Sequence, residues 1–260
     1  MPESQSVAIH QFPCLSDNFG VLLHDLVTKT TIAIDVPDAA PYLSELQAAG
    51  WTLTHILITH HHWDHVDGLQ DLKAATGAVV YGPKLSKDKI KGLDHLVDDG
   101  DELEIGPWTI ECIGTPGHTL DQISFFFPQL NVAHTGDTMF AMGCGRVFEG
   151  DLPMMWASLD KLAKRLPSDT EVYCGHEYTQ SNARFALTVD PNNEALKTRA
   201  ADVERLRSEG RPTLPTTMAQ ELATNPFLRA ADPAIQTHLG MEGQSPAAVF
   251  AEIRTRKDKG

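Results

Sequence analysis

The sequence predicts an α/β fold with metal-binding side chains at the ends of its strands, followed by a smaller helical part. Three observations support this prediction. Strand-like and helix-like segments alternate from residue 20 to about residue 175, several apolar runs end directly on histidine or aspartate, and only helical patterns follow beyond residue 179. Because α/β sheets bind ligands beyond the carboxyl ends of their strands, these side chains are expected at one edge of the fold.

Short runs rich in β-branched and aromatic residues, bounded by glycine, proline or polar residues, predict the strands. They are Gly20–His24, Thr31–Val36, Ile56–Thr59, Ala78–Tyr81, Trp108–Ile113, Ile123–Phe127, Val132–His134 and Glu171–Cys174. Residues 84–101 are charged and interrupted by glycine, so we expect a loop with some helix there.

Apolar residues at helical spacing predict the helices, and proline and glycine mark where several of them begin and end. They are expected over residues 41–49, 66–76, 153–166, 196–206, 218–223 and 247–254. We place a domain boundary where the strands stop. This gives one domain over residues 1–176 and a helical domain over residues 177–260.

Composition excludes several classes of protein. With 35 acidic and 21 basic residues, the 260-residue chain carries a formal net charge of -14, so most of its surface repels nucleic acids and anionic membranes. No stretch is apolar for long enough to span a bilayer, and the first residues lack the basic and apolar regions of a secretory signal, so we expect a cytoplasmic protein. The four cysteines are scattered without a C-x-x-C pair and are expected to be reduced and mostly buried.

A metal site is predicted at Thr59–His65, where four histidines and one aspartate follow an apolar strand. His60 and His62 are two residues apart, which places both side chains on the same face of an extended segment. Asp64 and His65 follow as the chain turns toward a helix. A catalytic zinc takes three protein ligands and leaves one position open, so this cluster has more ligands than one ion needs and indicates two ions. The alternative is a solvated histidine-rich turn, although no low-complexity tract surrounds it.

Three further candidate ligands, His118, Asp137 and His176, follow other predicted strands. Taken singly, each has an ordinary structural interpretation, as a turn residue, a side chain bonded to its own backbone, or a helix cap. Their joint occurrence with the first cluster favours metal binding. Together the candidate ligands number seven, which is enough to hold two ions with a shared carboxylate: His60, His62, Asp64, His65, His118, Asp137 and His176.

Six short motifs occur along the chain in this order: Thr-His-His-His-Trp-Asp-His, Thr-Pro-Gly-His-Thr, Thr-Gly-Asp-Thr, Gly-Cys-Gly-Arg, Tyr-Cys-Gly-His-Glu-Tyr and Asn-Pro-Phe-Leu-Arg. In these motifs the whole chain resembles the glyoxalase II family, the hydroxyacylglutathione hydrolases of the metallo-β-lactamase superfamily. The resemblance implies a four-layer αββα sandwich with a C-terminal α-helical domain. The catalytic domain would then cover residues 1–176 and the substrate-binding domain residues 177–260.

The same resemblance assigns the ligands. It implies that His60, His62 and His118 hold one ion. Asp64, His65 and His176 would hold the other ion. Asp137 would bridge the two.

The resemblance also implies a substrate, S-D-lactoylglutathione, which would be hydrolysed to glutathione and D-lactate in the second step of methylglyoxal detoxification. Arg146 stands where many relatives have lysine, and Phe148 stands where some have tyrosine, which removes one hydroxyl contact. The alternative for Arg254 and Lys257 is a solvated basic tail. The implied substrate-binding residues are Arg146, Phe148, Tyr178, Arg254 and Lys257.

Two divalent ions, expected to be zinc with iron or manganese as alternatives, would lower the pKa of a water to roughly 7. Asp64 and Asp137 would act as catalytic residues by holding and orienting the hydroxide. The leaving thiolate has a conjugate acid with a pKa of about 8.5 and needs no separate general acid. A glutathione persulfide dioxygenase and a lactonase-type hydrolase of the same fold are the alternative functions. We expect a monomer that acts on a small-molecule glutathione thioester.

Overall fold

The computed structural model describes residues 7–260, so the first six residues of the predicted domain 1–176 lie outside the described part. The chain divides into two compact units. Unit 1 runs to Gly114 and also includes Ile123–Leu130. Unit 2 comprises Thr115–Gln122 and Asn131–Gly260.

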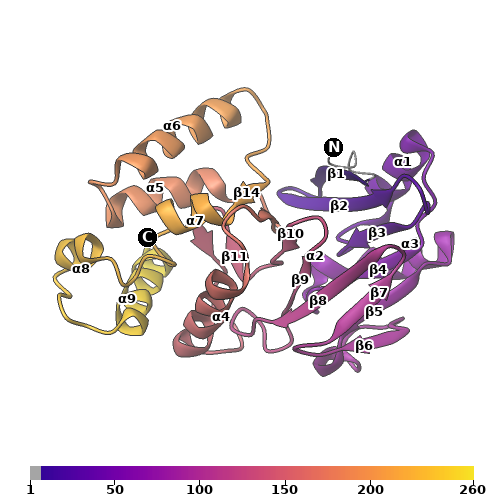
Figure 1. The fold of residues 1–260 in the computed structure, drawn as a ribbon, viewed down its shortest axis with the longest axis horizontal. Helices are drawn as coiled ribbons and strands as arrows, with labels where there is room; N and C mark the ends of the chain where they lie inside the picture. The colour runs from indigo at the N-terminus through magenta and orange to yellow at the C-terminus, as the bar shows by residue number, and fades with distance from the viewer. Residues whose placement is uncertain (1–6) are drawn as a thin grey trace. The chain divides into compact units, whose positions relative to one another are not determined.

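A six-stranded mixed sheet forms the larger part of unit 1 (Figure 1). The first three strands are antiparallel, and β3 to β6 are parallel. The parallel order brings the carboxyl ends of β3 and β4 to the same edge, so the residues that follow these two strands lie near each other. In chain order, which is also the order in the sheet, the strands are β1 (Val7–Cys14), β2 (Asn18–Asp25), β3 (Thr31–Ile34), β4 (His55–Leu57), β5 (Val79–Pro83) and β6 (His95–Val97).

Helices α1 (Ala39–Ala49) and α3 (Leu69–Thr76) share an apolar core with this sheet. The Asp38 side chain caps α1 by accepting a hydrogen bond from the Ala40 N–H, so the helix begins slightly before the predicted proline. The short helix α2 (Trp63–Val66) and the 3-10 turn η1 (Lys84–Ser86) connect these elements. The core includes Leu22, Ala33, Tyr42, Leu46, Ile56, Ile58, Leu69, Leu72 and Val80.

Three antiparallel strands complete unit 1: β7 (Glu102–Ile105), β8 (Trp108–Gly114) and β9 (Ile123–Phe127). β9 is buried along its whole length, which explains why four of its five residues are large and apolar. The turn between β8 and β9, which carries His118, belongs to unit 2.

In unit 2, β10 (Val132–His134) and β13 (Glu171–Tyr173) are parallel neighbours, and β14 (Thr216–Thr217) is antiparallel to β13. β11 (Met139–Phe140) and β12 (Gly143–Cys144) form a small antiparallel hairpin. His134 pairs with Tyr173. The residues three positions later, Asp137 and His176, therefore follow the same end of two adjacent strands.

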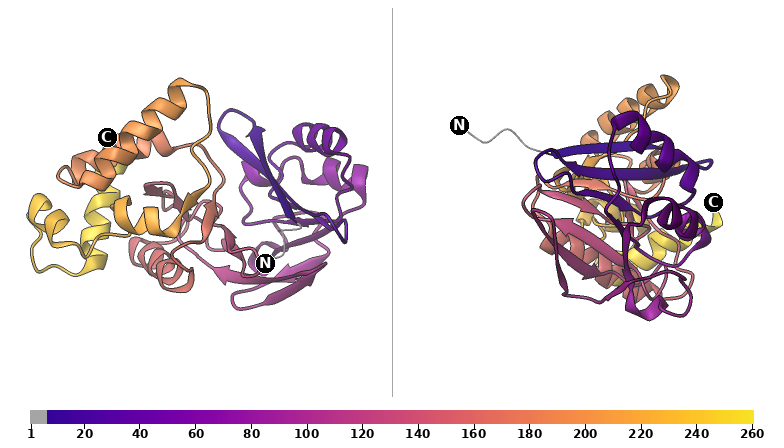
Figure 2. Two further views of the ribbon diagram at one scale, coloured as in Figure 1. Left: turned by 45° about the horizontal axis from the view of Figure 1, so that its top comes forward. Right: turned by 90° about the vertical axis from the view of Figure 1, so that its right-hand side faces the viewer.

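Six helices are described in unit 2. α5 and α6 pack along one another (Figure 1, Figure 2) and enclose an apolar cluster with Met142, Ala183 and Leu196. α4 contacts α9, where the ring centroids of Trp156 and Phe250 are 5.8 Å apart. The helices are α4 (Leu152–Arg165), α5 (Thr179–Val189), α6 (Glu194–Ser208), α7 (Met218–Thr224), α8 (Pro233–Leu239) and α9 (Pro246–Lys259).

The structure adds several elements that the sequence did not predict. β1 contains a proline, β7 is short, and α5 buries mainly small or polar residues such as Ala183, Ala186 and Asn182 instead of a stripe of large apolar ones. The four cysteines are free and buried, as predicted. Within residues 7–260, no helix combines the length and apolar character needed to cross a membrane.

Candidate metal centre and substrate residues

In unit 1, the chain continues beyond the carboxyl end of β4 directly into the predicted ligand segment. His60 and His65 are buried, and their ring centroids are 4.1 Å apart. The His62 ring lies 4.8 Å from that of His60 and directly precedes α2. Asp64, in the first turn of α2, has its Oδ2 3.7 Å from Nε2 of His65. The four predicted ligands of this segment are therefore close neighbours.

The buried carboxylate of Asp35 orients two of these histidines. Asp35 follows β3 with a φ of 55°, a left-handed conformation that aspartate adopts more readily than most residues. Its Oδ1 accepts from the Thr59 N–H at 2.7 Å, and its Oδ2 accepts from the Thr59 hydroxyl and from His65 Nδ1, both at 2.8 Å. Thr59 Oγ1 in turn lies 2.9 Å from His60 Nδ1. One carboxylate thus sets the orientation of both His60 and His65.

These contacts determine which ring nitrogen carries the proton in the neutral form of each histidine. An ionised carboxylate can only accept, and the Thr59 hydroxyl already donates its hydrogen to Asp35, so Nδ1 is the donor in both His65 and His60. Their Nε2 atoms then carry the lone pairs with which imidazole binds a metal ion. His134, which was not predicted as a ligand, has the opposite arrangement, because the Gly136 N–H donates to its Nδ1 at 3.2 Å.

In unit 2, Asp137 lies between two predicted histidine ligands. Its Oδ2 is 3.4 Å from Nε2 of His118 and 3.3 Å from Nε2 of His176, and all three side chains are buried. Nδ1 of His118 donates to the carbonyl oxygen of Arg146 at 2.8 Å. A neutral His118 therefore directs the lone pair of Nε2 toward a carboxylate oxygen, and a cation near both atoms relieves that repulsion.

The two distances fit a carboxylate that is shared between metal ions. Ligand atoms on a tetrahedral ion with bonds of about 2.1 Å are about 3.4 Å apart. A nitrogen–oxygen hydrogen bond is shorter, at roughly 2.7–3.2 Å. One oxygen of Asp137 is separated by this longer distance from each of the two histidines. Since imidazole and carboxylate also suit zinc and iron, the residues present fit divalent metal ions.

Three of the predicted substrate-binding residues lie close to the histidines of unit 2. The Tyr178 ring is stacked on His176, with centroids 4.7 Å apart and an interplanar angle of 4°. Phe148 is 63% exposed, and its ring centroid lies 5.3 Å from that of His118. Arg146 has an exposed side chain, while its carbonyl holds His118. Two aromatic rings and the backbone of a residue with an exposed cationic side chain thus lie beside His118 and His176.

Arg254 and Lys257 lie about one turn apart on α9. Arg254 is only 2% exposed, and it donates from Nη1 to the Cys144 carbonyl at 3.0 Å and from Nη2 to Asp258 at 2.7 Å. It is therefore part of the packed interior of unit 2. The Lys257 ammonium lies 5.0 Å from the centroid of Phe185. Burial, together with the nearby Arg254, lowers the pKa of Lys257 from 10.5 to about 8.

Close packing explains the glycines of the Gly-Cys-Gly-Arg motif. A Cβ on Gly145 would lie 2.0 Å from the carbonyl oxygen of Asp137, and one on Gly143 would lie 2.4 Å from Nδ2 of Asn182. Neither position has room for a side chain. Burial raises the pKa of Cys144 to about 11, so its thiol is protonated at neutral pH and is a poor nucleophile.

Three groups that form hydrogen bonds to the predicted ligand residues were not predicted from the sequence: Asp35, Asn18 and the Arg146 carbonyl. Asn18 donates from Nδ2 to the carbonyl oxygen of Asp64 at 2.9 Å. Asp35 had a detectable signal, because it ends a strand as the predicted ligands do. Asn18 and the Arg146 carbonyl had none, because their contacts connect residues 46 and 28 positions apart.

Comparison with known sequences identifies the family. The family model described as Hydroxyacylglutathione hydrolase C-terminus matches residues 177–260, and the one described as Metallo-beta-lactamase superfamily matches residues 20–176. The hydroxyacylglutathione hydrolase of Mesorhizobium japonicum is 55% identical over 97% of this chain and 99% of its own length. The chain belongs to the hydroxyacylglutathione hydrolase family. A hydroxyacylglutathione hydrolase of Brucella anthropi is 54% identical over 96% of each chain.

Solved structures share the fold of this hydroxyacylglutathione hydrolase family member. ETHE1 from Myxococcus xanthus superposes with a TM-score of 0.65 at 26% identity, covering 97% of this chain and 99% of that one. The BLEG-1 B3 metallo-beta-lactamase has a TM-score of 0.67 at 23% identity, covering 85% and 99%. The predicted fold class, a four-layer αββα metallo-β-lactamase sandwich with a C-terminal α-helical domain, is confirmed.

Proposed function

We propose that this hydroxyacylglutathione hydrolase family member is a binuclear-metal thioesterase. It hydrolyses S-(2-hydroxyacyl)glutathione, such as S-D-lactoylglutathione, to glutathione and a 2-hydroxy acid. The observation that carries the proposal is the position of Asp137 Oδ2, 3.4 Å from His118 Nε2 and 3.3 Å from His176 Nε2. Relatives that are 53–55% identical over nearly the whole chain are named for this activity.

The metal ligands in this proposal are the seven residues that the sequence predicts. One ion is assigned to His60, His62 and His118, and the other to Asp64, His65 and His176. Asp137 is assigned to both. Zinc is the proposed metal, with iron or manganese as alternatives, since the same donors accept each of them. Bound ions supply Lewis acidity, which lowers the pKa of water to roughly 7 and stabilises negative charge on the substrate carbonyl.

The chain's own residues bind and orient the reactants. Asp64 and Asp137 hold the nucleophile in position as acceptors for its hydrogen. The departing thiolate, with a conjugate-acid pKa of about 8.5, needs no general acid near neutral pH. Arg146, Lys257 and the buried Arg254 are proposed to attract the substrate carboxylates, and the thioester end is proposed to lie against Phe148 and Tyr178.

The proposal also assigns a function to each part of the chain. Residues 1–176 are assigned to catalysis, and residues 177–260 to substrate binding. The two family models meet between residues 176 and 177, which supports this division. We further propose a cytoplasmic monomer whose partner is the small thioester. The net charge of -14 supports the exclusion of nucleic acid as a partner.

The test is release of glutathione thiol from S-D-lactoylglutathione by the purified chain loaded with two metal equivalents. Asp137→Ala is expected to lower kcat at least a hundredfold. Asp190→Asn is the matched control, because Asp190 is a buried carboxylate of unit 2 that accepts from Arg229 and Asn193. The proposal fails if the wild-type chain releases no thiol or if Asp137→Ala turns over at the wild-type rate.

The alternative functions are not favoured, because the most similar of these relatives are named hydroxyacylglutathione hydrolase over nearly the full length of both chains. A persulfide dioxygenase would consume oxygen with glutathione persulfide. A lactonase-type hydrolase would open a lactone faster than it cleaves the thioester. Oxygen uptake and a lactone substrate, measured with the same preparation, separate the three activities.

A further inference from the structure

The β11–β12 hairpin connects two parts of the proposed active site. It begins two residues after Asp137 and ends two residues before Arg146. Its six residues, Met139 to Cys144, are all buried, and Met142 at its tip has a φ of 54°. Gly145 N–H donates to the Thr138 carbonyl at 3.2 Å and closes the base of the hairpin. A shift of the hairpin would therefore displace both the proposed bridging ligand and the exposed arginine.

The backbone of this hairpin is bonded by side chains from the helices. Nδ2 of Asn182, on α5, donates to the Ala141 carbonyl at 3.0 Å. Nδ2 of Asn225, directly after α7, donates to the Gly143 carbonyl at 3.0 Å and to the Phe140 carbonyl at 3.3 Å. These carbonyls belong to buried residues, which need hydrogen-bond partners within the protein.

Two charged side chains complete the contacts. The Met142 N–H donates to Oε2 of Glu221, on α7, at 2.8 Å. Nη1 of Arg254, on α9, donates to the Cys144 carbonyl at 3.0 Å. The hairpin backbone thus forms hydrogen bonds at five successive residues, from Phe140 to Cys144. The partners are side chains from three helices and from the residue after α7.

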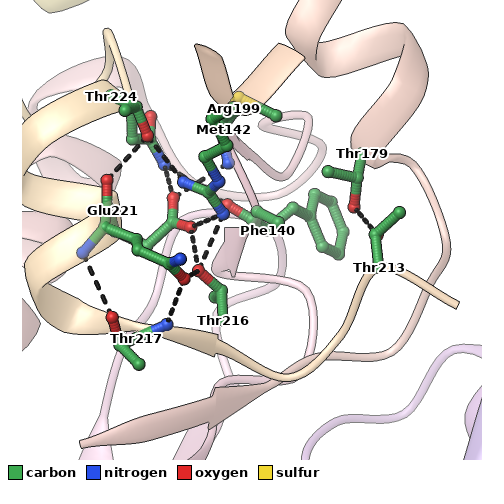
Figure 3. A network of polar contacts seen from close by, with 12 residues as sticks. Phe140, Met142, Thr179, Arg199, Thr213, Thr216, Thr217, Glu221 and Thr224 are labelled. Atoms are coloured by element: carbon green, nitrogen blue, oxygen red, sulfur yellow. Dashed lines mark hydrogen bonds and ion pairs between the residues drawn. The ribbon is translucent and has the colours of Figure 1, made fainter. Parts of the chain in front are cut away.

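Glu221 is itself held by a buried polar network (Figure 3). Its side chain is 0% exposed, and its Oε1 accepts from Arg199 Nη2 at 2.6 Å and from the Thr216 hydroxyl at 2.7 Å. The same guanidinium donates from Nη1 to Thr224 Oγ1 at 2.6 Å. Asn225 Nδ2 also donates to Oε2 of Glu221 at 3.0 Å. The ion pair with Arg199 compensates the buried charge, so Glu221 can accept from the hairpin.

We infer that the helical region of unit 2 positions the hairpin for catalysis, with Asn182, Glu221 and Asn225 as positioning residues. This inference rests on the proposed function. It gives a role to Asn225, the first residue of the Asn-Pro-Phe-Leu-Arg motif, which the substrate contacts do not explain. The helices then help to position the proposed metal ligand Asp137, in addition to binding the substrate.

The experiment replaces the two asparagines separately. Asn225→Ala removes the donor to Gly143 and Phe140, and Asn182→Ala removes only the donor to Ala141. Asn182→Ala decides the question if Asn225→Ala does not fold. Asp190→Asn is the matched control, because it removes the charge of a buried carboxylate that accepts hydrogen bonds from Asn193 and Arg229 in the helical region.

Three quantities are measured for each variant: hydrogen exchange of the peptide 137–146, the affinity for the second metal equivalent, and kcat and KM with S-D-lactoylglutathione. For Asn225→Ala we expect roughly 10- to 100-fold faster exchange in this peptide, because local opening becomes easier. We expect up to about 10- to 100-fold weaker metal binding, the range found when groups that orient a metal ligand are lost, because the hairpin adjoins Asp137. The expected effects of Asn182→Ala are in the same direction and smaller. kcat is expected to fall with metal affinity, and the control is expected to lose only thermal stability.

The result that would overturn the inference is wild-type exchange and metal affinity in both asparagine variants, with a loss of stability like that of the control. Exchange and metal binding do not depend on turnover. If the wild-type chain fails to hydrolyse the thioester, these two readouts still test the hairpin. Failure of the proposed function and failure of this inference are therefore distinguishable.

Discussion

Replacing Asp35 with asparagine tests whether one carboxylate sets the metal-binding form of His65. Oδ1 accepts from the Thr59 N–H, a group that can only donate, so the amide oxygen of the new asparagine must face it. The new NH2 group then takes the place of Oδ2 and faces His65 Nδ1 at a distance of 2.8 Å. Nδ1 must become an acceptor, which moves the ring proton to Nε2, the atom assigned to the metal. Asparagine also adopts the left-handed φ of 55° readily, so the substitution adds no backbone strain that could itself weaken metal binding.

The magnitude follows from the contact that is lost. If His65 kept its proton on Nδ1 in the variant, the Nδ1–H would face the NH2 group of the asparagine, and two donors would oppose each other. The hydrogen bond that His65 makes to the charged carboxylate would then be lost. Such a bond contributes about 1.5–3 kcal/mol, which is about 10- to 140-fold in an equilibrium constant. We therefore expect Asp35→Asn to bind at least one of the two metal equivalents more weakly by about that factor.

The assay is competition with a chelator for the two metal equivalents, together with ¹⁵N shifts of the His65 ring in the metal-free protein. Asp25→Asn is the matched control in unit 1, because the Asp25 carboxylate is also buried and accepts from the N–H groups of Val27 and Thr28. Wild-type affinity for both equivalents in Asp35→Asn, or a His65 ring that keeps its proton on Nδ1, would refute the reasoning.

The other predictions concern three residues, Gly145, Lys257 and Phe148. Gly145→Ala places a methyl group 2.0 Å from the backbone oxygen of Asp137, so we expect at least a tenfold loss of metal affinity and of kcat. Lys257 loses its charge as the pH rises through about 8, so KM for the anionic thioester should rise between pH 7 and pH 9, whereas Lys257→Arg should keep KM flat. The neutral form of Lys257 is favoured in the folded state between its pKa of about 8 and the ordinary 10.5, so it contributes stability that grows across this window and is lost as the pH falls through 8. Phe148→Tyr adds a hydroxyl to an exposed ring 5.3 Å from His118, and we expect KM to fall by roughly 2- to 10-fold.

Each of these predictions has an outcome that contradicts it. Full metal affinity and kcat in Gly145→Ala would show that the hairpin base yields without moving Asp137. A KM for the wild type that stays constant from pH 7 to pH 9 would mean that Lys257 does not contact the substrate as a cation. An unchanged KM in Phe148→Tyr would place the ring outside the substrate contacts.

Much of the fold could be predicted from the sequence, because local patterns carry it. Short, mainly apolar runs such as Ile123–Phe127 mark buried strands, and apolar residues at helical spacing mark most of the helices. β1 and α5 were missed, since a proline obscures the first and small buried residues leave no strong apolar stripe in the second. The candidate ligands were predictable for a related reason: each follows a strand closely, where side chains of an α/β fold converge.

What the sequence by itself determined is therefore the chemistry: the identity of the candidate metal ligands, the fold class and the family. The tertiary structure decided how those side chains are held. Asp35 selects the tautomer of His65, the Arg146 carbonyl does the same for His118, and Glu221 and Asn225 hold the hairpin that follows Asp137. The physical reason is that hydrogen-bond partners are set by distance in space. Contacts that join residues 28 to 85 positions apart leave no periodicity or spacing in the chain.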